Sequence, residues 1–178
     1  MFEELTVVKY PDPRLRQVAK PVDAFDERLK ALVARMFTLM RHHKGVGLAA
    51  PQVGVGQRLF VMNATGKPED DRVYINPELF DLTGTEEGEE GCLSLPEVNA
   101  MIDRSRTLRI VAKDVNGNRV EETQSGYIAR IWQHEFDHLN GILITDRMGD
   151  VQRMAHRKQL RDLEKEYEVA HPKKRGKK

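Results

Sequence analysis

Residues 126–140 read GYIARIWQHEFDHLN, and this stretch decides both the fold and the chemistry of the chain. Apolar side chains fall on nearly every side of a helix through it, and Asn140-Gly141 supplies a stop signal. A helix this apolar is buried, yet it carries two histidines and two carboxylates, which need partners. His134 and His138 lie four positions apart, so both rings face one side of the helix. The stretch therefore predicts a buried helix that binds a metal ion.

Glu135 follows His134 directly and completes a His-Glu-x-x-His pattern. Its carboxylate is close enough to the predicted ion to handle the proton of a water molecule without binding the ion itself. A catalytic metal usually takes three protein ligands and leaves one position for water, so the pattern requires a third ligand.

The third ligand has several candidate sources. One class of zinc peptidases places a histidine where this chain has Ile144, which excludes that pattern. A second class uses a glutamate on a following helix, and Glu164 or Glu166 could serve. The better candidate is Cys92 in EEGCLSLP, because it is the only thiol and the glycine before it lets the backbone turn its side chain toward an ion. One alternative is that Cys92 is simply a small buried side chain, as single cysteines often are. Another is a nucleophilic cysteine–histidine pair, but this would leave the second histidine unexplained.

The stretch GVGLAAPQ, residues 45–52, is the third notable motif. Its small side chains leave the backbone open, so a substrate can approach the N–H and C=O groups closely. It lacks the Lys-Ser/Thr ending of a phosphate-binding loop, which argues against nucleotide binding. The alternative is a tightly packed connection between a helix and a strand.

The composition limits the class of protein. The 178 residues fit one domain, which we expect to be a catalytic metallohydrolase domain at 1–170 with a basic tail at 171–178. Twenty-nine Lys and Arg against 28 Asp and Glu give no chain-wide field for a membrane or for sequence-specific nucleic acid binding. One cysteine excludes an internal disulfide, and we find neither a signal peptide nor a membrane-spanning run. These features predict a cytoplasmic protein.

Hydrophobic periodicity and turn residues predict the other elements. The expected helices are 23–43, 126–140 and 151–170, and the expected strands are 58–62, 73–76, 79–84, 107–113 and 119–123. This order predicts an α+β fold, with mixed or antiparallel sheets packed around the metal-bearing helix and with an N-terminal and a C-terminal helix.

The three motifs, in this order, resemble the peptide deformylase family. The family pattern is a Gly-x-Gly-hydrophobic-Ala-x-x-Gln loop, then Glu-Gly-Cys-hydrophobic-Ser, then Gln-His-Glu-x-x-Asp/His. The matching residues are Gly45, Gly47, Ala49 and Gln52; Glu90, Gly91, Cys92, Leu93 and Ser94; and Gln133, His134, Glu135, Asp137 and His138. The resemblance runs from Tyr10 to about Met148, and Arg104 falls where the family carries an arginine.

The resemblance implies an α+β fold and hydrolysis of the formyl group from the N-terminal N-formylmethionine of newly synthesised polypeptides, which releases formate. It implies one divalent metal ion, Fe(II) first, with Zn, Ni or Co as alternatives. It assigns three metal ligands, a general acid–base and two donors to the developing oxyanion: Cys92, His134 and His138; Glu135; and the Gln52 side-chain amide with the Leu93 backbone N–H.

The same resemblance suggests how N-formylmethionyl peptides bind. Gly45, Val46 and Gly47 would pair with the peptide backbone as an added strand, which accepts many sequences. Ile131, one turn before the catalytic residues, would form a wall of the methionine pocket, although a plain core position is the simpler interpretation.

Charge and family position also predict an ion pair between Glu90 and Arg104 that holds the cysteine turn. For Asp137, the sequence leaves open whether it orients a metal ligand or faces solvent.

The last seven residues, PKKRGKK, carry five cations. They predict a disordered, solubilising end. The alternative is a ribosome contact, in which the C-terminal helix and this tail bind ribosomal RNA and bring the enzyme to nascent chains.

Two other functions remain open at the level of sequence. A zinc endopeptidase with a glutamate ligand would make Cys92 a bystander, so Cys92→Ser would leave it nearly intact. A peptide- or ribosome-binding module with a structural metal would tolerate Glu135→Gln, because closed structural sites need no catalytic glutamate.

Overall fold

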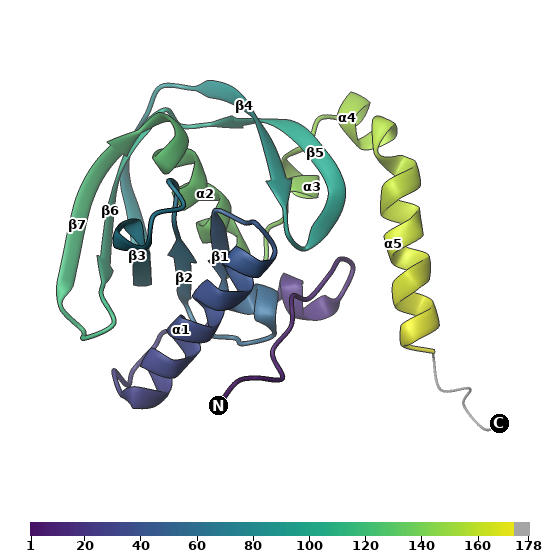
Figure 1. Ribbon diagram of the computed structural model, residues 1–178. Coiled ribbons are helices and arrows are strands. Elements are labelled where there is room, and N and C mark those ends of the chain that lie inside the picture. Colours follow the sequence, from purple (N-terminus) through teal and green to yellow (C-terminus); the bar gives the residue numbers. More distant parts are fainter. Residues whose placement is uncertain (173–178) are drawn as a thin grey trace.

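Figure 1 shows the computed structural model, which describes residues 1–172. The predicted basic tail at 171–178 therefore lies outside the described residues, apart from His171 and Pro172. The helices are α1 (Glu27–His42), α2 (Gly126–Leu139), α3 (Ile144–Arg147), α4 (Asp150–Ala155) and α5 (Arg157–Ala170), with short 3-10 turns at Pro13–Arg16, Ala50–Val53 and Pro68–Asp70.

The strands form two antiparallel sheets. The larger has the order β1 (Gly47–Ala49), β2 (Leu59–Met62), β3 (Arg72–Thr83), β6 (Thr107–Lys113) and β7 (Arg119–Ser125). The smaller is the hairpin of β4 (Glu86–Cys92) and β5 (Leu95–Arg104). The predicted α+β class is confirmed, and of the two sheet types expected, the antiparallel one is observed.

Both faces of the larger sheet are covered at β2, which explains why this strand is apolar throughout. Leu59 and Val61 point toward α1 and join its core cluster. Phe60 and Met62 point the other way and join the cluster of α2. Alternate residues of a strand face opposite sides, so a strand between two helices must be apolar at every position.

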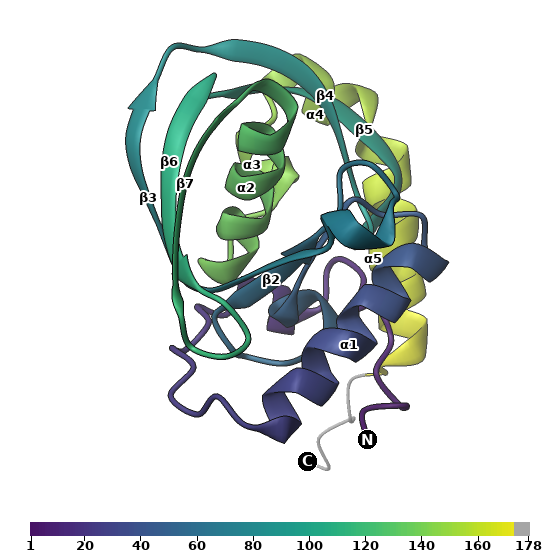
Figure 2. The same cartoon turned by 60° about the vertical axis from the view of Figure 1, so that its left-hand side comes forward.

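Helix α2 lies in the concave side of the curved larger sheet, with the β4–β5 hairpin passing across its end (Figure 2). Trp132 is fully buried and packs edge-on against Tyr74 of β3, with 5.6 Å between the ring centroids. The polar residues of this helix are buried as well, including His134 and His138. The predicted buried helix is therefore present within one residue of its predicted end.

The β4–β5 hairpin was not predicted. Residues 86–92 are acidic and mostly exposed, but β5 alternates buried and exposed positions through Val98, Ala100 and Ile102. The strands join through a tight turn, with Cys92 paired to Leu95. The hairpin therefore presents Cys92 at its tip.

Three predicted boundaries were wrong. The first helix begins at Glu27, not at residue 23, because Asp26 caps it by accepting a hydrogen bond from the Leu29 N–H. The strands predicted at 73–76 and 79–84 are one strand, β3, with a register shift between Ile75 and Glu78. The helix predicted at 151–170 is broken at His156 into α4 and α5.

Helix α5 lies along the outside of the molecule, away from the larger sheet (Figure 1). It is fixed by the buried Leu163 and by a 2.7 Å hydrogen bond from the Tyr10 hydroxyl to Glu164. Among residues 1–172, none of the helices combines the length and the apolar character that crossing a membrane requires.

Candidate metal centre

Three potential ligand atoms converge from two elements, the tip of β4 and the middle of α2. The Cys92 Sγ lies 3.3 Å from the His138 Nε2, which lies 3.3 Å from the His134 Nε2. All three atoms lie within 4.8 Å of one another. A tetrahedral ion with ligand bonds of about 2.0–2.3 Å keeps its ligands roughly 3.3–3.8 Å apart. The spacing and the soft donor set therefore fit one divalent transition-metal ion.

The two histidine rings lie in different environments. The His134 Nδ1 is 2.9 Å from the Glu90 Oε2, so the carboxylate orients the ring and leaves Nε2 facing the cysteine. Burial would raise the pKa of Glu90, but hydrogen bonds from Arg104 and His134 outweigh it and hold that pKa well below its ordinary value. Burial holds the pKa of His138 well below its ordinary value, so this ring is neutral, as a metal ligand requires.

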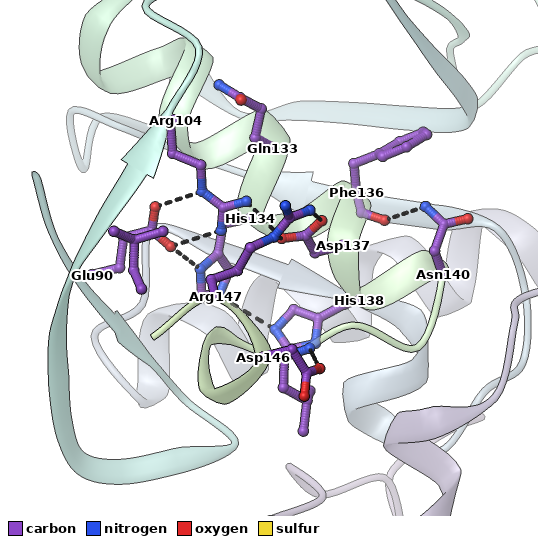
Figure 3. A network of polar contacts seen from close by, with 12 residues as sticks. Glu90, Arg104, Gln133, His134, Phe136, Asp137, His138, Asn140, Asp146 and Arg147 are labelled. Atoms are coloured by element: carbon purple, nitrogen blue, oxygen red, sulfur yellow. Dashed lines mark hydrogen bonds and ion pairs between the residues drawn. The ribbon is translucent and has the colours of Figure 1, made fainter. Parts of the chain in front are cut away.

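A chain of charged side chains, buried except for Arg147 at its end, supports the site from behind (Figure 3). The Arg104 guanidinium donates to both oxygens of Glu90, at 2.8 and 2.9 Å, which confirms the predicted ion pair. It also donates to Asp137 at 2.6 Å. Asp137 is buried and in turn accepts from Arg147 at 2.6 and 3.0 Å. Of the two roles open for Asp137, the solvent-facing one is excluded.

Arg130 is a supporting residue that the sequence analysis missed. Its guanidinium donates to Glu90 at 2.9 Å and to the carbonyl oxygens of Ile102 at 2.7 Å and Glu86 at 2.6 Å. Arg130 therefore ties both strands of the hairpin to α2. The available signal was an arginine in an apolar helix, four positions before His134 and so on the same face.

Glu135 follows His134 on α2 and is buried. Its Oε2 is buried and has no hydrogen-bond partner among the described residues. Burial raises the pKa of this carboxyl to about 7. A Cβ atom on Gly47 would lie 2.3 Å from the Glu135 Oε1, so only glycine leaves room for the carboxylate here. The glycine-rich stretch thus has a packing reason for Gly47.

Gln52 is held with its amide nitrogen toward the ligands. Its Oε1 accepts a 2.8 Å hydrogen bond from the Ala49 N–H, which fixes the orientation of the amide. The Nε2 is 3.5 Å from the Cys92 Sγ and 3.2 Å from the Ser94 Oγ. Leu93 lies between Cys92 and Ser94 in the sequence, and its side chain packs against Gly45. A Cβ atom on Gly45 would lie only 2.7 Å from the Leu93 Cδ1.

A cleft of about 300 Å³ opens beside these groups. Nine of the ten residues singled out from the sequence line it: Gly45, Val46, Gly47, Gln52, Cys92, Leu93, Ile131, His134 and Glu135. The tenth, His138, lies behind them and completes the ligand set. Of the two alternative third ligands, Glu164 instead accepts the hydrogen bond from Tyr10, and Glu166 lines a separate cavity beside the N-terminal segment. A metal site, a buried carboxylate and an oriented amide facing one small cleft are suited to hydrolysis of an amide.

Comparison with known proteins agrees with this chemistry. A family model described as polypeptide deformylase matches residues 4–154. The peptide deformylase of Thermotoga maritima is 49% identical over 155 residues, which cover 86% of this chain and 93% of that protein. The Pseudomonas aeruginosa peptide deformylase is 43% identical over 157 residues, covering 88% and 94%.

Solved structures give the same result. A crystal structure of the Plasmodium falciparum peptide deformylase superimposes with a TM-score of 0.91 at 39% identity, covering 94% of this chain and 100% of that one. A plant peptide deformylase also gives a TM-score of 0.91, at 42% identity, covering 95% and 94%.

Proposed function

The chain belongs to the polypeptide deformylase family, and from this premise we propose that it removes the N-terminal formyl group at a metal ion held by Cys92, His134 and His138. Relatives 43–50% identical over most of the chain support the deformylase function. The substrates would be N-formylmethionyl peptides and nascent chains, and the products formate and a free amino terminus. The observation that carries the proposal is the convergence of a thiol and two imidazoles beside the buried Glu135.

A bound divalent ion would supply Lewis acidity and would lower the pKa of a water molecule. Fe(II) is the ion we propose, as the family resemblance implies. Zinc, nickel and cobalt also accept a ligand set of one thiolate and two imidazoles.

Glu135 is the proposed proton carrier. It accepts a proton from the attacking water and later delivers it to the departing amine, so the water oxygen joins the formyl carbon as the C–N bond breaks. A carboxyl with a pKa of about 7 can both take and give a proton near neutral pH. Its Oε2 has no hydrogen-bond partner within residues 1–172, which leaves this oxygen free to bind the water.

Gln52 and Leu93 are the proposed donors to the oxyanion. Negative charge grows on the formyl oxygen as water adds, and the Gln52 Nε2 and the Leu93 N–H would meet it. Because the Ala49 N–H already fixes the Gln52 amide, little reorganisation is needed. One such donor is typically worth about 3–4 kcal/mol.

The peptide backbone would bind between two strand edges. Among the described residues, β1 pairs only with β2, and β4 pairs only with β5, so each strand has one edge without a partner strand. Both strands line the cleft, β1 through Gly47 and β4 through residues 89–91. An extended peptide could add to these edges through main-chain hydrogen bonds. Val46 and Ile131 would then bound the pocket for the methionine side chain.

Glu135→Gln tests the proposal. We expect formate release from formyl-Met-Ala to fall at least about 100-fold, because the proton carrier is lost. Metal content per chain should stay at the parent level. Glu87→Gln, a matched change at an exposed carboxylate of β4, should keep parent turnover. Parent-like turnover of Glu135→Gln would refute the role of Glu135.

The remaining sequence-based predictions have no test in the structure. We propose a single catalytic domain at 1–170 and a cytoplasmic location. A ribosome contact through α5 and the basic tail also stays a prediction.

A further inference from the structure

A second cavity adjoins the cleft on the far side of Leu93. It has a volume of about 760 Å³ and lies between the N-terminal segment, α1 and the turn after β4. We call it the basic groove. It shares Cys92 and Leu93 with the cleft of the metal centre, so these two residues form the boundary between the cavities.

The groove has a one-sided charge. Lys9, Arg35, His42 and His43 line it, and none of its lining residues within 1–172 is acidic. Lys44 follows His43 and lines the cleft, so it adds a cation close to the groove, although the cleft also carries the exposed Glu89. The whole chain has a formal net charge of only +1, so this bias belongs to the groove and not to the protein as a whole.

The direction of a bound peptide leads toward this groove. Gly47 lies against Glu135, so the reacting end of the substrate is near Gly47. Gly45 lies against Leu93, at the boundary of the groove. A peptide that pairs with this edge and runs from Gly47 toward Gly45 therefore leaves the catalytic groups and reaches the groove after about two residues, at roughly 3.3 Å per residue.

We propose that the basic groove binds the third and following residues of the formylated peptide and favours acidic side chains there. This rests on the proposed function, and it adds a preference beyond the methionine pocket. Lys9 and Lys44 are exposed and Arg35 is half-buried, so each pair with an acidic residue contributes a modest attraction that salt weakens. Acidic and basic peptides should therefore differ mainly in KM and little in kcat.

The test compares three peptides that share formyl-Met-Ala-Ser and end in Glu-Glu, Gln-Gln or Lys-Lys. With the metal-loaded parent at about 20 mM salt, we expect kcat/KM to be roughly tenfold higher for the Glu-Glu peptide than for the Lys-Lys peptide. The ratio should approach one at about 300 mM salt, where charges are screened. Equal kcat/KM for the three peptides at low salt would overturn the inference.

Two variants locate the effect. Lys9→Glu reverses one charge in the groove and should reduce the ratio by roughly fivefold. Lys158→Glu makes the same change at an exposed position of α5 and should leave the ratio at the parent value. A ratio unchanged in Lys9→Glu, or changed equally in both variants, would show that the groove is not the site. Failure of the deformylase function is distinguishable, because then none of the three peptides would release formate.

Discussion

Gly47→Ala is the sharpest test of how the catalytic carboxylate is held. The new Cβ atom would lie 2.3 Å from the Glu135 Oε1, 2.8 Å from its Cδ and 2.9 Å from its Cγ. Ordinary contacts begin at 3.4 Å, so the Oε1 must move by about 1.1 Å (3.4 minus 2.3). Gly47 is not in the left-handed region, so the alanine backbone itself is unstrained.

A displacement of about 1 Å from reacting geometry costs on the order of 100-fold in rate, or about 2.7 kcal/mol. We therefore expect kcat for formyl-Met-Ala to fall about 100-fold, with parent metal content, because the three atoms nearest the new Cβ all belong to Glu135 and not to a ligand. Gly56→Ala is the matched control, since its Cβ meets nothing within 4 Å.

The cause can be separated from general damage by a double variant. If Gly47→Ala acts only through Glu135, the double variant with Glu135→Gln should be no slower than Glu135→Gln alone. Formate release measured under saturating substrate decides this. A single variant within threefold of parent kcat would refute the reasoning, as would full additivity of the two changes.

Three further outcomes follow from the contacts of the site and its surroundings. Cys92→Ser should lose most of its bound metal on dialysis against a chelator, measured as metal per chain; retention at the parent level would mean that the thiol is a bystander. Arg104→Ala removes the cation that the buried Glu90 and Asp137 share. It should lower the free energy of unfolding, measured in urea, by about 3–5 kcal/mol. Arg106→Ala, at an exposed position, should change it by less than about 0.5 kcal/mol. The hydrogen bond from Arg14 lowers the pKa of Asp12, so the stabilisation of the folded state is present above about pH 4 and is lost as the pH falls below that value. The difference in free energy of unfolding between the parent and Asp12→Asn should therefore shrink below about pH 4. A constant difference down to about pH 2 would contradict this prediction.

The sequence was sufficient for the parts of the fold that show a clear period. Strand β6 was predicted to the residue from its alternating apolar positions, and helix α2 nearly so from its apolar side chains on most sides and its Asn-Gly stop signal. The β4–β5 hairpin escaped because β4 consists mostly of Glu and Gly, which are rare in strands. Its stability comes from pairing with β5 and from the guanidinium of Arg130, which are contacts between distant segments.

The candidate site divides in the same way. His134, Glu135 and His138 lie in one short motif, so their spacing predicted them. Cys92 lies 42 positions before His134, and it was assigned as the third ligand because it is the only thiol and because the chain resembles the deformylase family. Arg147 lies ten positions after the Asp137 that it binds and belongs to a separate helix, and no local pattern marks it. Such residues are set by how the chain turns between α2 and α3, which a periodic pattern does not encode.

The two strand edges left open for a peptide carry a risk of aggregation, because unpaired backbone groups can also pair with another copy of the chain. The protein limits this risk in two visible ways. β1 is only three residues long, which gives a second copy little to pair with. β4 exposes Glu86, Glu87 and Glu89, and their like charges would repel the same edge of a neighbour. The two edges can therefore bind a peptide strand while the protein itself resists aggregation at high concentration.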